Sequence, residues 1–103
     1  MTGKELRQIL LDKWGYSYDI QLRRIQDKMQ AQIMWRYQEQ LSFPLSEADY
    51  IDHLEAIVAH LNDWGVVEQV QEFIQTTKIR PRLGKAVCIP LKMGMRSIEW
   101  MVE

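Results

Sequence analysis

The chain has 103 residues, of which 47% are hydrophobic and 26% are charged, a length and composition typical of one globular domain rather than of a disordered segment. It contains no run of about eighteen apolar residues, so no membrane span is predicted, and its charged N-terminal segment lacks the pattern of a signal peptide. Cys88 is the only cysteine, which excludes an intrachain disulfide and favours a reducing compartment.

The net charge of −1 conceals an uneven distribution of charge along the chain. Residues 1–40 have seven basic and five acidic side chains, residues 41–77 have seven acidic and no basic ones, and residues 78–103 have six basic and two acidic ones. The three segments therefore carry +2, −7 and +4. This pattern disfavours general affinity for nucleic acids, which needs a large basic excess, but it allows a basic face and an acidic face on one domain.

The first predicted elements are a helix and a strand. Thr2 and Glu5 match the capping-box pattern ahead of apolar side chains at helical spacing, and Gly15 can end the helix in a left-handed conformation. The sequence therefore predicts a helix over residues 3–14. Residues 16–23 alternate apolar and polar side chains with period two, which is typical of a half-buried strand.

From about Gln26 the apolar period changes, and we expect a second helix that ends before Pro44. Its apolar face would consist of Met29, Ile33, Met34, Tyr37 and Leu41. Trp35 points away from that face. Either the helix is sandwiched between two layers, which the pattern favours in a small α+β domain, or the Trp35 indole is exposed for contact with a partner.

The second half of the chain predicts two well-marked helices and a strand. Ser46 is a suitable N-cap for a helix that runs to Trp64 and stops at Gly65, and a further helix is expected over residues 66–77. Residues 86–91 alternate as a strand that lies at a sheet edge or ends at Pro90, because proline has no N–H. A short last helix is expected over residues 95–102.

Together these elements predict an α+β fold, a mainly helical single domain over residues 1–103 with a small two-stranded sheet. The strands at 16–23 and 86–91 should pair with each other, since a lone strand leaves its backbone groups unpaired, and helices should cover their apolar face. The side chains expected to be buried there are Tyr18, Ile20, Leu22, Val87 and Ile89.

The usual motifs for catalysis or cofactor binding are missing. The Gly84–Lys85 pair lacks the earlier glycine and the following helix of a nucleotide-binding loop. His53 and His60 are seven residues apart on one helix, about 10 Å along its axis, which is too far for both to bind one metal ion. Cys88 alternates within an apolar strand, where packing is its expected role. The sequence predicts no metal site, cofactor or catalytic residues.

Basic residues at two places form the candidate binding site. If the two strands pair, Arg23 and Arg24 at the end of one strand could approach Arg80, Arg82 and Lys85 before the other. Such a cluster would attract a phosphate group or an acidic partner; the alternative is a solvated basic rim with no ligand. A group of methionines near the C-terminus, at positions 93, 95 and 101, suggests an adaptable apolar surface as well.

Three stretches, "KWGYSYDIQL", "MWRYQEQLSFPLSEADYIDHL" and "RLGKAVCIPL", followed by "EW", resemble a domain-of-unknown-function family of cyanobacteria and chloroplasts. The resemblance covers about residues 3–100, and its middle stretch is the most specific. It implies a soluble single domain of an oxygenic phototroph, located in the bacterial cytoplasm or in the stroma of a plastid. The lack of a transit peptide favours the bacterial case. The family carries no assigned activity, so no catalytic residues follow from the resemblance.

These observations favour a non-catalytic binding or assembly module that uses its basic patch and an apolar surface. The expected partner is a protein with an acidic or otherwise anionic surface. Two alternatives stay open: association with RNA or the ribosome, and a small enzyme whose site is built from scattered polar residues.

Overall fold

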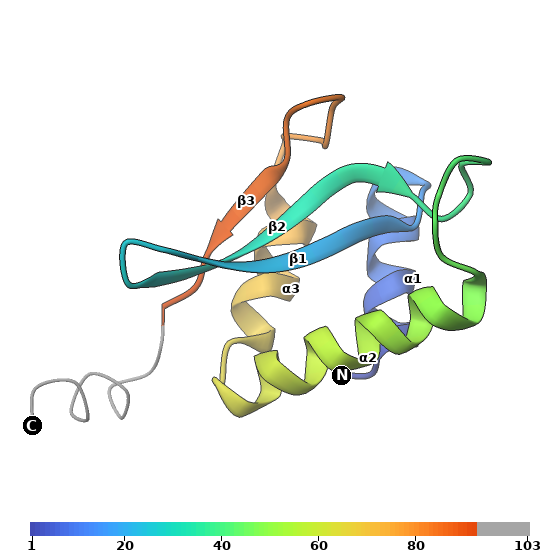
Figure 1. Ribbon diagram of the computed structural model, residues 1–103. Coiled ribbons are helices and arrows are strands. Elements are labelled where there is room, and N and C mark those ends of the chain that lie inside the picture. The colour runs from blue at the N-terminus through green and yellow to red at the C-terminus, as the bar shows by residue number, and fades with distance from the viewer. Residues whose placement is uncertain (93–103) are drawn as a thin grey trace, which may run out of the picture.

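The computed structural model describes residues 1–92 and contains six regular elements in this range (Figure 1). In chain order they are α1 (Gly3–Trp14), β1 (Tyr18–Ile25), β2 (Lys28–Tyr37), α2 (Glu47–Asp63), α3 (Val67–Thr76) and β3 (Val87–Pro90). The α+β class is confirmed. The helix expected over residues 95–102 and the methionines at 93, 95 and 101 lie outside the described residues.

The three strands form one sheet in the order β1-β2-β3, and both neighbouring pairs are antiparallel. As a result β1 and β3 run in the same direction on either side of β2. Helices α1 and α3 lie side by side under one face of the sheet, and α2 crosses beneath them along the β1 side (Figure 1). None of the helices within residues 1–92 is long and apolar enough to cross a membrane.

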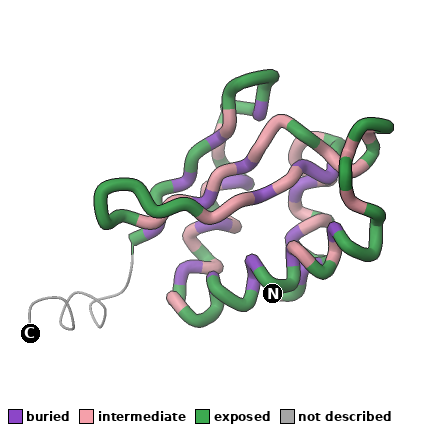
Figure 2. The backbone as a smooth tube through the Cα atoms, in the orientation of Figure 1, coloured by how far each residue is buried: buried purple, intermediate pink, exposed green. Residues whose placement is uncertain are grey.

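Two predictions about the sheet are wrong. Residues 26–41 are not a helix: most of them form β2, which lies between the two expected strands and prevents them from pairing. A two-residue turn connects β1 to β2, since Ile25 pairs with Lys28. Gln26 and Asp27 in this turn both have positive φ, 50° and 64°, as a tight type I′ hairpin requires. The hairpin projects beyond the helices, and its tip is exposed (Figure 2).

The core lies between the inner face of the sheet and the helices. Of the five sheet residues expected to be buried, Tyr18, Ile20, Val87 and Ile89 are, while Leu22 is only half-buried because it lies toward the projecting hairpin. The prediction that Cys88 packs inside is wrong: Val87 and Ile89 take the inner face, so the period of two turns Cys88 outward.

The predicted helices at 3–14, after Ser46 and at 66–77 are confirmed, with the expected caps on the first two. The Thr2 hydroxyl oxygen accepts a hydrogen bond from the Glu5 N–H at 3.2 Å, and the Glu5 carboxylate accepts one from the Thr2 N–H. Ser46 caps α2 through the N–H of Asp49. These local interactions set the starts of α1 and α2 and hence the direction in which each leaves the adjoining loop.

Candidate functional site

A basic pocket of about 610 Å³ lies between the start of β3 and the segment that follows α3. Four cationic side chains line it: Lys78, Arg80, Arg82 and Lys85. The other lining residues are Phe73, Ile79, Ala86, Val87 and Cys88, so no acidic side chain is among them. Three of the four bases are the ones singled out from the sequence. Lys78 was missed there, although it starts the same basic run, "KIRPR".

A compact turn positions these bases. Arg82 and Lys85 exchange two backbone hydrogen bonds, Arg82 N to Lys85 O at 3.0 Å and Lys85 N to Arg82 O at 2.7 Å. Gly84 has φ 77°, the left-handed value that the third residue of a type II turn needs and that glycine adopts without strain. Pro81 is buried on the other arm. The bases are therefore presented by a structured hairpin anchored to the core.

The charge of the pocket is not neutralised from within. All four bases are exposed, and the ion pairs found in residues 1–92 are those of Arg7, beside a close contact between His53 and Asp19. The acidic segment 41–77 lies mainly on α2 and α3, and its ion pair to Arg7 is made by Glu47. The basic pocket is therefore available to an anionic group from outside.

The other two predicted bases do not join this pocket. Their approach required β1 and β3 to pair in opposite directions, whereas the two strands run in the same direction with β2 between them. Through β2, Arg23 is level with Pro90, at the end of β3, while Ile20 is level with Val87, at its start. Three residues of strand correspond to about 10 Å. Arg23 and Arg24 therefore lie toward the hairpin tip, away from the pocket.

Trp35 is on β2 and is half-buried. The sandwiched helix that was expected to hold it does not exist, because the segment is a strand. Trp35 is not among the partly buried hydrophobic side chains of residues 1–92 that pack against the core. Its contact with a partner stays a prediction.

A second pocket, of about 530 Å³, lies at the opposite edge of the sheet, where Arg23 of β1 and residues of α2 line it. His53, His60 and Trp64 also line it, and the His60 and Trp64 rings stack with their centroids 5.4 Å apart. His53 is tied to the strand, since its Nε2 lies 2.8 Å from the Ile20 carbonyl oxygen. Because a carbonyl can only accept, Nε2 carries the proton and donates it there.

Asp19 lies next to this histidine in a polar network between α2 and β1. Its Oδ1 is 3.2 Å from His53 Nε2, but the single Nε2 hydrogen serves Ile20, and Oδ1 is buried without a hydrogen bond of its own. Burial is the main cause that raises the pKa of the Asp19 carboxyl above its usual range, and the nearby His53 opposes it. The neighbouring Tyr50 hydroxyl donates to the Tyr18 carbonyl at 2.7 Å.

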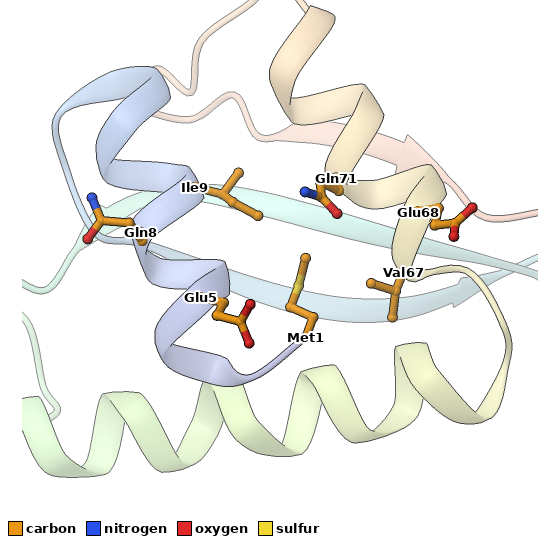
Figure 3. A pocket seen from close by; sticks show the side chains of 7 residues that line it. All are labelled: Met1, Glu5, Gln8, Ile9, Val67, Glu68 and Gln71. Carbon is orange, nitrogen blue, oxygen red and sulfur yellow. The ribbon is translucent and has the colours of Figure 1, made fainter.

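A third pocket, of about 440 Å³, lies in the groove between α1 and α3 (Figure 3). Glu5 and Glu68 are its charged lining residues, and the side chains of Met1, Ile9 and Val67 supply its apolar part. Its charge is opposite to that of the pocket beside β3. The structure thus has the separate basic and acidic surfaces that the charge pattern allows.

The chain matches the family described as "Domain of unknown function (DUF3067)" over residues 4–101. It belongs to this family. It is also similar to a solved structure, the solution NMR structure of the Alr2454 protein from Nostoc sp. strain PCC 7120, with 56% sequence identity and a TM-score of 0.91. The match covers 100% of this chain and 99% of that one. No curated protein sequence gives a significant match. The resemblance to an uncharacterised cyanobacterial family is confirmed.

Proposed function

We propose that this DUF3067 protein is a non-catalytic binding module that engages an anionic partner through the basic pocket beside β3. The observation that carries the proposal is a pocket lined by four exposed bases and no acid. Cations that make no ion pair within residues 1–92 are free to neutralise charge on a second molecule. The chain would do this in the cytoplasm of an oxygenic phototroph, the setting that its family and the Nostoc relative suggest.

The favoured partner is a protein with an acidic surface rather than RNA. Sequence-tolerant binding of single-stranded RNA uses aromatic side chains on which bases stack. The only aromatic residue lining the basic pocket is Phe73. The overall charge of −1 also gives little long-range attraction for a phosphate backbone.

The test uses two triple variants with the same change in charge. The first replaces Arg80, Arg82 and Lys85 by Gln; the matched control replaces Arg23, Arg24 and Lys28, the exposed bases at the hairpin tip, by Gln. Binding of fluorescein-labelled poly-glutamate is followed by anisotropy at low salt, with a single-stranded RNA of equal charge as the second probe. Thermal unfolding of both variants shows whether the fold is intact, since exposed charges contribute about 0–1 kcal/mol each.

The pocket variant should bind poly-glutamate about tenfold more weakly, if each lost contact contributes about 0.5 kcal/mol. The hairpin control should stay within about twofold of the natural protein, and added salt should remove most of the difference between them. Equal losses in the two variants would show a diffuse charge effect and overturn the proposal. Tighter binding of the RNA probe would replace an acidic protein by a nucleic acid as the partner.

A further inference from the structure

The two edges of the sheet differ in whether the outward backbone groups of the edge strand have hydrogen-bond partners. On the β1 edge, α2 supplies partners: the Tyr50 hydroxyl donates to the Tyr18 carbonyl at 2.7 Å, and His53 Nε2 donates to the Ile20 carbonyl at 2.8 Å. These side chains occupy the outward carbonyls of the strand. A further strand therefore cannot pair with this part of β1.

The pairing of β3 with β2 fixes which backbone groups of β3 point outward. Leu91 N–H donates to the Met29 carbonyl at 3.1 Å, and the register continues from this pair through Ile89 to Val87. In an antiparallel ladder the hydrogen-bonded pairs alternate with pairs whose N–H and C=O point away. Val87, Ile89 and Leu91 therefore bond to β2, while the N–H and C=O of Cys88 point away from it.

The outward groups of Cys88 find no partner in residues 1–92. Pro90, two residues further along, faces the same way and has no N–H to leave unpaired, which is the usual place for proline in a sheet. An edge strand with free backbone groups is a template for pairing with another extended chain.

This free edge forms one wall of the basic pocket. The hairpin at Arg82 and Lys85 is a single bridge that does not extend into a longer ladder. The next hydrogen-bonded pair in its register would be Arg80 with Val87, but the Val87 backbone already bonds to β2. The two arms therefore part, and the pocket lies between residues 78–80 on one side and residues 86–88 on the other.

We propose that an acidic segment of a partner protein binds in this pocket in extended conformation and adds to β3 as a fourth strand of the sheet. This rests on the proposed function and names the form of the anionic partner. Four bases without an acid select negative side chains, and free backbone groups on an edge select a polypeptide strand. Because side chains alternate along a strand, apolar residues between the acids would meet Phe73, Ile79 and Val87.

The experiment uses the full chain and two synthetic peptides. One is acetyl-Glu-Val-Glu-Val-Glu-Val-Glu-amide; the other has the same sequence with every backbone amide methylated, which keeps the charge and removes all donors. Affinities are measured by titration of the amide spectrum of the ¹⁵N-labelled protein. Hydrogen exchange of the Cys88 amide is measured with and without peptide.

The unmodified peptide should bind at least about tenfold more tightly than the methylated one, since two or more hydrogen bonds contribute roughly 1 kcal/mol each. It should also slow exchange of the Cys88 amide and give nuclear Overhauser contacts between its α protons and β3. Equal affinity of the two peptides overturns strand addition. If the two peptides bind equally, and the variant with Arg80, Arg82 and Lys85 replaced by Gln binds both of them more weakly than the natural protein does, the charge-based function stands without strand addition.

A backbone variant gives an independent readout on the protein. Cys88→Pro removes the outward N–H and no bond to β2, whereas Cys88→Ala removes the thiol and keeps the N–H. Cys88→Pro should lower the affinity for the unmodified peptide by about 3–10-fold, which corresponds to the loss of one hydrogen bond. Cys88→Ala should leave this affinity unchanged. Equal affinity of the two variants overturns strand addition. If Cys88→Pro does not fold, the comparison of the two peptides on the natural chain decides.

Discussion

Replacing Tyr50 by Phe tests how α2 is attached to the sheet. Tyr50 is fully buried, and its hydroxyl donates to the Tyr18 carbonyl at 2.7 Å. The substitution keeps the ring and its packing but leaves a buried carbonyl without a partner, which costs about 1–3 kcal/mol. In a domain of this size each kcal/mol lowers Tm by roughly 4–8 °C. Urea unfolding monitored by circular dichroism gives the free energy directly.

The control is Tyr16→Phe, because Tyr16 is 39% exposed and its hydroxyl makes no hydrogen bond within residues 1–92. We expect a change below about 0.5 kcal/mol for this variant. If both substitutions cost the same, the hydrogen bond to the β1 edge contributes nothing and the reasoning about that edge fails.

The pH dependence of Tyr50→Phe supplies a second check. Burial, with a smaller contribution from Asp19, raises the pKa of the Tyr50 phenol above its ordinary value of 10.0. The folded state therefore holds the proton more firmly than the unfolded state above that pH, so the contribution of Tyr50 to stability decreases as pH rises. The difference in unfolding free energy between the natural protein and Tyr50→Phe should shrink above pH 10.0. A difference that grows there would contradict the burial of the phenol.

Three further substitutions test other parts of the fold. Burial raises the pKa of the Asp19 carboxyl above its ordinary 3.8, so its ionisation costs folding free energy as pH rises from that value. Asp19→Asn should therefore gain stability relative to the natural protein from pH 3.8 upward, as measured by urea unfolding at several pH values. A relative loss of stability would contradict this. Ile89→Ala removes a side chain that is 1% exposed and should destabilise the fold by about 2–5 kcal/mol in the same assay, whereas a cost below 1 kcal/mol would mean that β3 is poorly packed. Gly3→Ala, usually favourable in a helix, should lower Tm instead, because its Cβ would lie 2.8 Å from the Glu55 backbone N; a raised Tm would show that α2 shifts easily.

The helices could be predicted from the sequence because their signals are local. A capping box at Thr2, a left-handed glycine at position 15 and an N-cap at Ser46 each specify a helix end without help from the rest of the chain. The packed stripes between these ends follow the helical period. The class α+β followed from these helices together with the alternation in β1 and β3.

The strand β2 was missed because its local preferences conflict with its structure. Methionine, glutamine and alanine favour helices, and the turn before the strand has Gln26 and Asp27 at positive φ where asparagine and glycine are usual. A weaker signal was present: Gln30 and Gln32 alternate with Ala31 and Ile33, as in a half-buried strand. Pairing on both sides by β1 and β3 overrides the local preference.

The error in β2 explains the error in the site. The grouping of Arg23 with Arg80 depended on which strands are neighbours and on their direction, and both are set by contacts between residues far apart in sequence. The part of the site built from one local run could be predicted: Arg80, Arg82 and Lys85 do line one pocket. The contribution of Phe73 to its apolar wall could not, because this side chain reaches the pocket from α3 through the tertiary packing.

The same bases can protect the free edge of β3 and select what binds to it. An open edge strand risks pairing with a second copy of the chain, and natural proteins discourage this with lysine and arginine near the edge. In an antiparallel pairing of two copies centred on Cys88, Lys92 of one copy would lie opposite Gly84 and beside Lys85 of the other, and the repulsion between these bases opposes self-association at low salt. An acidic strand is instead attracted to the same bases. The proposed specificity therefore predicts a monomer at low salt by sedimentation, and dimers through β3 only where salt or the removal of these charges weakens the repulsion.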